Sequence, residues 1–182
     1  MGKFLEEVNK RIDGVPIQRC YHCLKCTAGC PLAFAMEYNL DKVVRMIQMG
    51  KRDEVLKSAT IWLCVSCETC ITRCPNEVDI ARMMDVLREM AIESKVAAKE
   101  KNILKLHESF LSGIMMNGRI NEALLVAGYK LKSGDFFSDL AMGMNMFLKG
   151  KLSLFSPRTR DMRAVRNIFR KTQQGRQEEE RR

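Results

Sequence analysis

The chain has 182 residues, with 31 Lys and Arg against 22 Asp and Glu, and its formal charge is +9 at pH 7. This length fits one domain, or one domain with an appendage. No apolar stretch reaches the roughly 18 residues that a membrane span needs, and no secretory apolar segment precedes Cys20, so we expect a soluble cytoplasmic protein.

The first feature along the chain is a run of four cysteines with the spacing C-x2-C-x2-C-x3-C-P, which recurs 44 residues later. The first run comprises Cys20, Cys23, Cys26 and Cys30, and the second run comprises Cys64, Cys67, Cys70 and Cys74. No cysteine lies outside the two runs. The constant separation of 44 indicates an internal repeat, with two similar halves around a pseudo-two-fold axis.

This spacing is that of bacterial ferredoxins, in which three thiolates of one run bind one [4Fe–4S] cluster and the fourth binds the other cluster. It therefore predicts two [4Fe–4S] clusters with crossed ligation. One cluster is expected on Cys20, Cys23, Cys26 and Cys74, and the other on Cys64, Cys67, Cys70 and Cys30.

Other readings of the cysteines are less favoured. Zinc sites usually separate two C-x2–4-C pairs by a long loop, whereas three cysteines follow one another closely here, twice. A disulfide framework suits short secreted chains, and the C-x-x-C-H motif of haem attachment is absent. His22, inside the first run, is read as an exposed loop side chain, with a hydrogen bond near the cluster as the alternative.

The stretch between the two runs reads as helical. Asn39 or Asp41 can cap a helix that ends near Gly50, and Asp53 can cap a shorter helix. The apolar positions expected on one stripe of the first of these helices are Leu40, Val43, Val44 and Ile47.

Downstream of the second run, Asp79 opens a long helix whose apolar residues recur at steps of three and four. These are Ile80, Met83, Met84, Leu87, Met90 and Ala91. Helical character is expected to continue to Leu111. Three further helices are expected, over Arg119 to Lys132, Phe136 to Lys149 and, after the break at Ser156-Pro157, Arg160 to Lys171.

No segment alternates with period two long enough to predict a sheet, so the predicted fold class is all-α. Residues 1–100 are expected to form a helical ferredoxin domain with two [4Fe–4S] clusters, and residues 101–172 a helical assembly region. Residues 173–182 are polar and charged, and a disordered tail is expected there.

Two features of the C-terminal region allow alternatives. Met142, Met144 and Met146 favour adaptable core filling, with a subunit interface as the other reading.

The second feature is basic charge: from Lys151 onward ten Lys and Arg stand against four Asp and Glu. The basic face of the last helix is read as a solvated face, or as a docking site for an acidic partner. No aromatic residues interleave with it, so nucleic-acid binding is not indicated. Its members are Arg160, Arg163, Arg166 and Arg170.

The residues around the cysteines resemble the C subunit of heterodisulfide reductase. The similarity covers about residues 15 to 95 and is carried by Cys-Thr-Ala-Gly-Cys-Pro in the first run and Trp62-Leu-Cys at the start of the second. Val78-Asp-Ile80 and Met84-Asp-Val-Leu-Arg88 extend it. Other families with helical ferredoxin domains, such as glycolate oxidase subunits, carry Cys-Cys-Gly motifs downstream, and this chain has none.

The resemblance implies an electron relay within an oxidoreductase complex. A flavin- and cluster-bearing A subunit would supply electrons, and a catalytic B subunit would cleave the disulfide of coenzyme M and coenzyme B in methanogenesis. A hydrogenase or formate dehydrogenase module is a further candidate partner, and the isolated chain is expected to be non-catalytic. The alternative is an iron–sulfur adaptor or redox sensor of another complex, such as a succinate- or glycolate-oxidising one. A self-contained reductase is disfavoured because no G-x-G-x-x-G loop is present.

Overall fold

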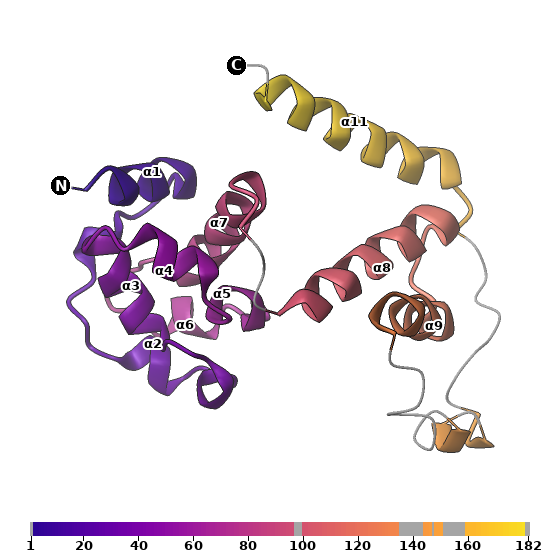
Figure 1. Ribbon diagram of the computed structural model, residues 1–182, viewed down its shortest axis with the longest axis horizontal. Helices are drawn as coiled ribbons and strands as arrows, with labels where there is room; N and C mark the ends of the chain where they lie inside the picture. The colour runs from indigo at the N-terminus through magenta and orange to yellow at the C-terminus, as the bar shows by residue number, and fades with distance from the viewer. Residues whose placement is uncertain (1, 97–99, 135–143, 147, 151–158, 181–182) are drawn as a thin grey trace. The chain divides into compact units, whose positions relative to one another are not determined.

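The computed structural model describes residues 2–96, 100–134, 144–146, 148–150 and 159–180, and for residues 173–180 the backbone alone. Within these ranges every regular element is a helix, which confirms the all-α class. The chain divides into two compact units, Met1–Lys101 and Asn102–Arg182 (Figure 1). Most of the helix expected over Phe136 to Lys149, with Met142 in it, and the break at Ser156-Pro157 lie outside the described residues.

Short connections link the helices of the first unit. They are α1 (Lys3–Ile12), the 3₁₀ helix η1 (Ile17–Arg19), α2 (Lys25–Ala28), the 3₁₀ helix η2 (Ala33–Ala35), α3 (Leu40–Gln48), α4 (Arg52–Lys57), α5 (Thr60–Leu63), α6 (Thr69–Thr72) and α7 (Ile80–Glu93). Beyond them lie α8 (Lys101–Asn117), α9 (Glu122–Ser133) and α11 (Met162–Glu180).

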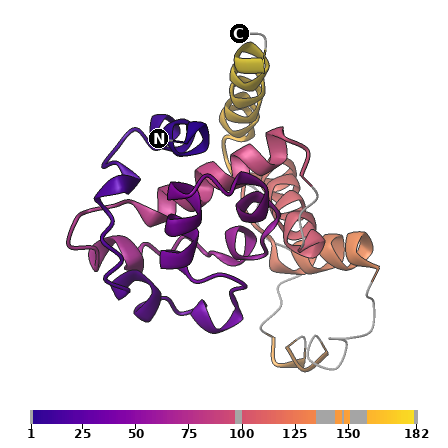
Figure 2. The ribbon, with the colours of Figure 1, turned by 60° about the vertical axis from the view of Figure 1, so that its left-hand side comes forward.

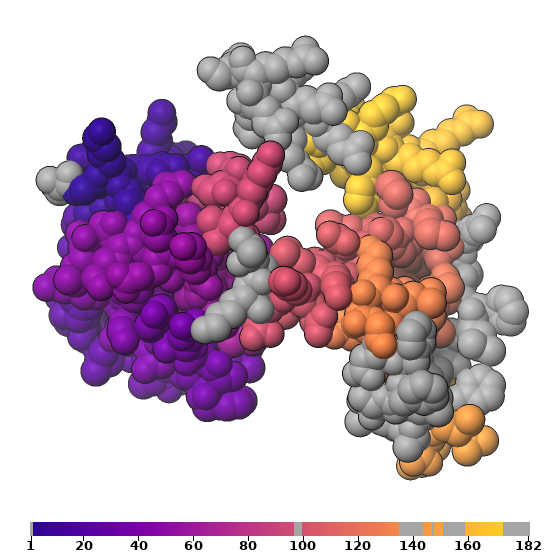
Figure 3. Space-filling model, in the orientation of Figure 1, coloured from indigo at the N-terminus to yellow at the C-terminus, as the bar shows by residue number. Residues whose placement is uncertain are grey.

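Helix α7 forms the centre of the first unit, where α1, α4, α5 and α6 pack against it, and α3 packs against α1, α2 and α4 (Figures 1 and 2). Its apolar stripe is buried as the periodicity predicts, with Met83, Met84, Leu87 and Met90 fully enclosed. Burying each such side chain stabilises the fold by about 1.5–3 kcal/mol. The space-filling view shows the side chains of the first unit packed against one another on the face drawn (Figure 3).

The predicted start of helix α7 is found, but its predicted end is wrong. Asp79 caps α7, because its Oδ1 accepts the backbone N–H of Arg82 at 2.7 Å. The helix does not continue to Leu111, however: it ends at Glu93, and Lys95 adopts a left-handed conformation with φ 51°. The N–H of Val96 then donates to the carbonyl of Ala91, a bond that closes a helix C-terminus.

Helix α3 has the predicted bounds but not the predicted cap. It begins after Asn39, whose side chain makes no capping hydrogen bond, and Asp41 lies inside the helix with its side chain on Thr27. Gly50 follows the helix, and its φ of 75° lets the chain turn there. The next helix, α4, begins at Arg52 after Lys51, so Asp53 lies in its first turn and is not the capping residue.

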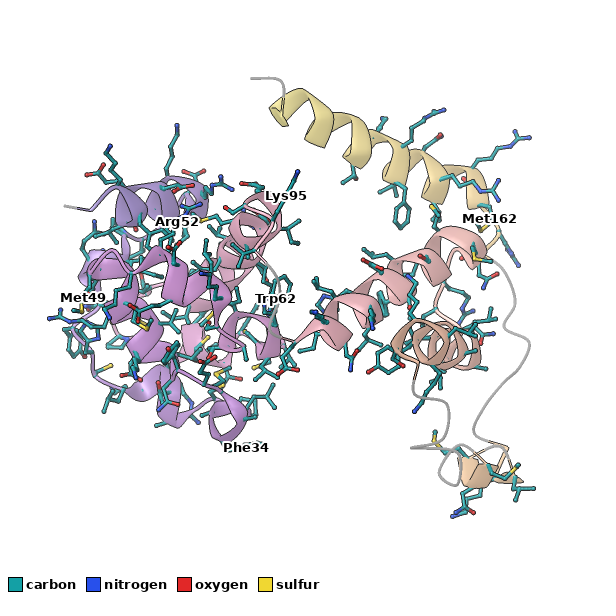
Figure 4. The ribbon with its side chains drawn as sticks, viewed as in Figure 1. Phe34, Met49, Arg52, Trp62, Lys95 and Met162 are labelled. Atoms are coloured by element: carbon teal, nitrogen blue, oxygen red, sulfur yellow. The ribbon has the colours of Figure 1, made fainter. Side chains whose placement is uncertain are left out.

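Helix α1 was not predicted from the sequence, although its apolar residues Phe4, Leu5, Val8 and Ile12 are all buried. Two ion pairs tie it to the rest of the unit. Arg11 contacts Glu93 at 2.8 Å, and the Arg11 guanidinium lowers the pKa of the Glu93 carboxyl by hydrogen bonding and charge. Arg52, labelled in Figure 4, contacts Glu7 at 2.5 Å and donates to Ser94.

In the second unit, α8 and α9 lie side by side in both ribbon views (Figures 1 and 2). Lys132 pairs with Glu108 at 3.1 Å, and Asn121 caps α9 by accepting the N–H of Leu124. Met144 and Met146 are exposed, so the described part of the methionine cluster does not fill a core.

Helix α11 exposes Arg163, Arg166 and Arg170 as the periodicity predicts. Its backbone continues to Glu180, through most of the stretch expected to be disordered, because the Gln, Arg and Glu residues there are strong helix formers. Among the described residues, no helix has the length and apolarity needed to cross a bilayer.

Candidate iron–sulfur centres

The eight cysteines line two cavities in the first unit, four around each. The first cavity contains about 320 Å³ of space, open solvent included, and its cysteines are Cys20, Cys23, Cys26 and Cys74. The second contains about 340 Å³ and its cysteines are Cys30, Cys64, Cys67 and Cys70. Each cavity therefore brings together three cysteines of one run and the fourth of the other. All eight thiols are free.

Left-handed backbone positions shape both cysteine loops. His22 and Leu24 flank Cys23 with φ 58° and 65°, and Ser66 and Glu68 flank Cys67 with φ 48° and 60°. The two pairs are again 44 residues apart. Non-glycine residues seldom adopt this conformation. At Leu24 and Glu68 it directly precedes the first residue of a short helix, and such a left-handed and right-handed pair turns successive N–H groups toward one concave side, which favours anions.

Short helices follow these loops and position the last two cysteines of each run. α2 begins directly after Leu24 and carries buried Cys26, and α6 begins directly after Glu68 and carries buried Cys70. Helices α2 and α6 pack on each other. This contact brings Cys30, just after α2, to the second cavity, and Cys74, just after α6, to the first. The Cys74 sulfur also accepts the N–H of Val78 at 3.3 Å.

Polar side chains, one of them a carboxylate, hold the first loop. His22, which lines the first cavity, is half-buried and bonds to Gln48 Oε1 at 3.0 Å. Gln48 also donates to the carbonyl of Ile17. Asp41 lines the same cavity and accepts the hydroxyl of Thr27 at 2.6 Å. His22 is therefore not an exposed loop side chain, and the alternative reading, a hydrogen-bonded residue beside the cluster site, is the one that fits.

An arginine holds the second loop. Arg88 of α7 donates through Nε to the carbonyl of Ile61 at 2.5 Å and through Nη2 to the carbonyl of Cys64. Its Nη1 contacts Asp85 at 2.8 Å, and both residues bond to Ser66. The sequence pattern assigned no such role to Arg88, because a basic residue on a surface helix carries no signal of what its guanidinium reaches.

The thiols differ in their electrostatic environment. Burial, and next the charge of Cys64, raises the pKa of Cys70 to about 11, and burial also raises the pKa of Cys26. The hydroxyl and N–H of Thr69 lower the pKa of exposed Cys67. Buried thiols of this kind ionise when a cationic group is there to bind the thiolate.

The donor set fits [4Fe–4S] clusters. Soft thiolates select zinc, Cu(I) or iron–sulfur clusters, and a cubane takes four cysteine thiolates. Each cavity offers four thiols around a space of similar size. Within the described ranges, no three His, Cys, Asp or Glu side chains converge on one point as ligands of a single metal ion do.

Apolar side chains lie at the surface next to the cysteine loops. Cys67 is the exposed cysteine among the eight, and its neighbour Val65 is also exposed. Phe34, close after Cys30, is 86% exposed and projects from η2 at the outer edge of the unit (Figure 4). Tyr21 and Leu24 are large exposed hydrophobic residues in the first cysteine loop. Large exposed apolar side chains of this kind mark contact surfaces.

Comparison with known proteins agrees with this site. Residues 16–78, which include all eight cysteines, match the family described as 4Fe-4S dicluster domain. The chain is 33% identical over 110 residues to the iron–sulfur C subunit of the CoB--CoM heterodisulfide reductase of Methanopyrus kandleri, covering 57% of each protein. It is 35% identical over 102 residues to a second such protein, the C 2 iron–sulfur subunit of Methanocaldococcus jannaschii, covering 56% of this chain and 51% of that protein.

A third relative is matched over more of its length. The C2 subunit of the H(2)/formate:CoB-CoM heterodisulfide,ferredoxin reductase of Methanococcus maripaludis is 28% identical over 145 residues, which cover 80% of this chain and 70% of that protein. The matches span little more than half the length of the first two relatives. The family match and these relatives together confirm the resemblance, and the chain is a homologue of the C subunits of heterodisulfide reductases with a 4Fe–4S dicluster domain.

Proposed function

We propose that this chain is the electron-transfer subunit of an oxidoreductase complex of the heterodisulfide reductase type. The observation that carries the proposal is the grouping of the eight thiols around two cavities, three from one run and one from the other at each. When bound there, [4Fe–4S] clusters accept and release single electrons.

The proposed ligands follow from this grouping. One cluster is held by Cys20, Cys23, Cys26 and Cys74, and the other by Cys64, Cys67, Cys70 and Cys30. Because each run lends one thiolate to the opposite cluster, the two halves of the domain hold each other in place. The N–H of Val78 already donates to the Cys74 sulfur, and the left-handed loop residues are proposed to turn further N–H groups toward the thiolates and so stabilise their negative charge.

The proposed partners are a flavin-containing A subunit, which supplies electrons, and a catalytic B subunit, which reduces the CoM-S-S-CoB heterodisulfide in methanogenesis. A hydrogenase or formate dehydrogenase module is the proposed source further upstream. The names of the relatives support this assignment. We place the complex in the cytoplasm.

The second unit is proposed to be an assembly region, residues 101–172. Helix α8 exposes Leu106, Phe110, Leu111 and Met116, and α9 exposes Leu124, Val126 and Leu131. Among the described residues beyond 101, the buried side chains are polar, Ser109 and Asn121. A unit that encloses so little apolar surface gains little stability from its own folding. Its apolar faces are suited to a partner subunit.

The chain itself is proposed not to reduce the substrate. With all four thiolate positions of each cluster taken by cysteine, no coordination site remains open for a disulfide. Cleaving a disulfide also needs two electrons, whereas a cubane passes one at a time.

Anaerobic purification tests the proposal. Two cubanes predict roughly eight irons and eight sulfides per chain. The reduced protein should pass electrons to a dye and to the B subunit, but it should not cleave heterodisulfide when the B subunit is absent. The A and B subunits should co-purify from a native preparation.

Three results contradict the proposal. Stoichiometric zinc without sulfide would remove its basis. Clusters that are lost on oxidation, without reversible reduction, would favour the redox-sensor alternative. Heterodisulfide reduction by the purified chain at the rate of the complex would assign it the catalytic role.

A further inference from the structure

The internal repeat makes the surroundings of the two cavities directly comparable. Helix α3 packs on α2 beside the first cavity, and α7 packs on α6 beside the second. At the separation of 44 residues, Asp41 of α3 corresponds to Asp85 of α7, and Val44 corresponds to Arg88. The acidic residue is thus present in both halves, whereas the basic residue is present in the second half alone.

At the first cavity the carboxylate acts without an opposing cation. Asp41 lines the cavity, and its bonds are to the neutral hydroxyl of Thr27, next to Cys26. Within the described residues it forms no ion pair. His22 lines the same cavity, and its Nε2 is hydrogen-bonded to the side-chain oxygen Oε1 of Gln48. The position equivalent to Arg88 is taken by Val44, which is fully buried.

At the second cavity the cation is held against the ligand loop. The Arg88 side chain is 15% exposed and donates to the carbonyl of Cys64, whereas its partner Asp85 is 40% exposed. Water therefore screens the carboxylate more than the guanidinium. Neither residue lines the cavity itself, but the guanidinium bonds to the backbone of Cys64, which does. The less screened cation of the pair therefore favours added negative charge at this cavity.

The remaining charges do not reverse the difference. Glu68 lines the second cavity, but it is exposed and its field is screened by water. Lys25, Lys42 and Arg45 on the side of the first cavity are likewise exposed. The exposure of the cysteines, like Arg88, favours the reduced form of the cluster in the second cavity. Cys67 of that cavity is exposed, whereas Cys23 of the first cavity is half-buried. Solvent stabilises the more negative, reduced form of a cluster, which raises its potential.

We infer that Asp41 and Arg88 give the clusters of the two cavities different reduction potentials, an inference that rests on the proposed function. The cluster in the first cavity has the lower reduction potential, and the cluster in the second cavity has the higher one. Clusters held by the cysteines of the two cavities would pass one electron from the first cavity to the second, with no bond formed or broken. The donor subunit then supplies electrons at the first cavity, and the acceptor subunit removes them beside exposed Cys67.

The test is a potentiometric titration of the full, cluster-loaded chain followed by electron paramagnetic resonance. Asp41→Asn keeps the oxygen that accepts from Thr27 and removes the charge, so it should shift the lower midpoint potential to a more positive value. Asp53→Asn is the matched control, because it removes the same charge from an exposed position on α4, and it should move neither potential. Cys23→Ser identifies which signal belongs to the first cavity.

A second pair of variants tests the other site from both sides. Arg88→Gln removes the cation but keeps an N–H donor for the loop carbonyls, and it should shift the higher potential to a more negative value. Asp85→Asn leaves Arg88 in place without its counter-charge and should shift that same potential to a more positive value, even if Arg88→Gln loses the second cluster. Equal potentials in the unchanged chain, or an Asp41→Asn shift in the signal of the second cavity, would overturn the inference while leaving the relay intact. A chain that binds zinc in place of the clusters would overturn both.

Discussion

The side chain of Arg73 lies directly against Gly29, its equivalent 44 residues earlier in the chain. A Cβ atom built on Gly29 would lie 2.5 Å from Cδ and 2.8 Å from Nε of Arg73. Both residues precede the fourth cysteine of their run, at the contact of α2 with α6. Equivalent residues meet where a pseudo-two-fold axis passes, and there is room for one side chain only. Glycine in the first half leaves that room to the arginine of the second.

This contact predicts strong coupling between the two positions. Gly29 has a right-handed conformation, φ −93° and ψ −5°, so Gly29→Ala alone carries no backbone strain and would stabilise by about 0.4–1 kcal/mol in open space. With Arg73 present that gain should vanish or reverse, because the arginine stem must move. In an Arg73→Ala background the gain should return. Anaerobic thermal unfolding of the four loaded proteins measures the cycle, and additive effects of the two substitutions would contradict the contact.

The crossed arrangement of the cysteines predicts which cluster each substitution damages. Cys74→Ser should perturb the cluster bound by Cys20, Cys23 and Cys26, because Cys74 lines the first cavity. Cys30→Ser should perturb the other cluster for the same reason. Either change should also destabilise the unit, since the fourth thiolate joins its halves. Resonance spectra in which each substitution damages the cluster of its own run would refute the crossing.

Spacing and periodicity predicted the helical core and the grouping of the thiols. A constant separation of 44 residues and a fixed C-x2-C-x2-C-x3-C pattern leave few ways to arrange eight cysteines, and Met83 and Leu87 are buried where a 3.6-residue period places them. Such features depend on residues near one another in the sequence. They are therefore visible before the fold is known.

What the sequence did not reveal depends on long-range contacts or on backbone conformation. Glu68 and Lys95 are ordinary polar residues, and nothing in their type marks a left-handed φ. The role of Arg88 depends on carbonyls more than twenty residues away. Helix α1 is a different case, because Phe4, Leu5, Val8 and Ile12 already form an apolar stripe that periodicity could have found.

The hydrogen bonds of Arg88 predict that its substitution removes the cluster of the second cavity and leaves the cluster of the first in place. Arg88→Ala removes the donors to the carbonyls of Ile61 and Cys64 and leaves them unpaired in a partly buried place. Charge-assisted bonds of this kind are worth about 1.5–3 kcal/mol each, and an unpaired buried group costs about 1–3 kcal/mol. The iron content should therefore fall toward half, with the signal of the first cavity retained.

Arg82→Ala is the control for this prediction. Arg82 lies on the same helix, but it is 47% exposed and its contact to Glu89 is 3.7 Å long. Its removal should change stability by less than about 0.5 kcal/mol and leave the iron content unchanged. Equal loss of iron from both cavities in Arg88→Ala would show that the arginine supports the whole unit and not the second loop.

The last prediction concerns the separate roles proposed for the two units, cluster binding in the first and partner binding in the second. The first unit has an apolar core of its own and contains every cysteine, whereas the described part of the second encloses no apolar side chain. A chain that ends at Glu100 should therefore keep both clusters and lose co-purification with its partners. On the full chain, reversing the exposed charges of Arg163, Arg166 and Arg170 to Glu should weaken binding to an acidic partner and leave the iron content unchanged. Salt should weaken binding of the unchanged chain in the same way, because exposed charges are screened within about 10 Å at 0.1 M. Truncation that strips the clusters while partner binding survives would assign the two roles the other way round.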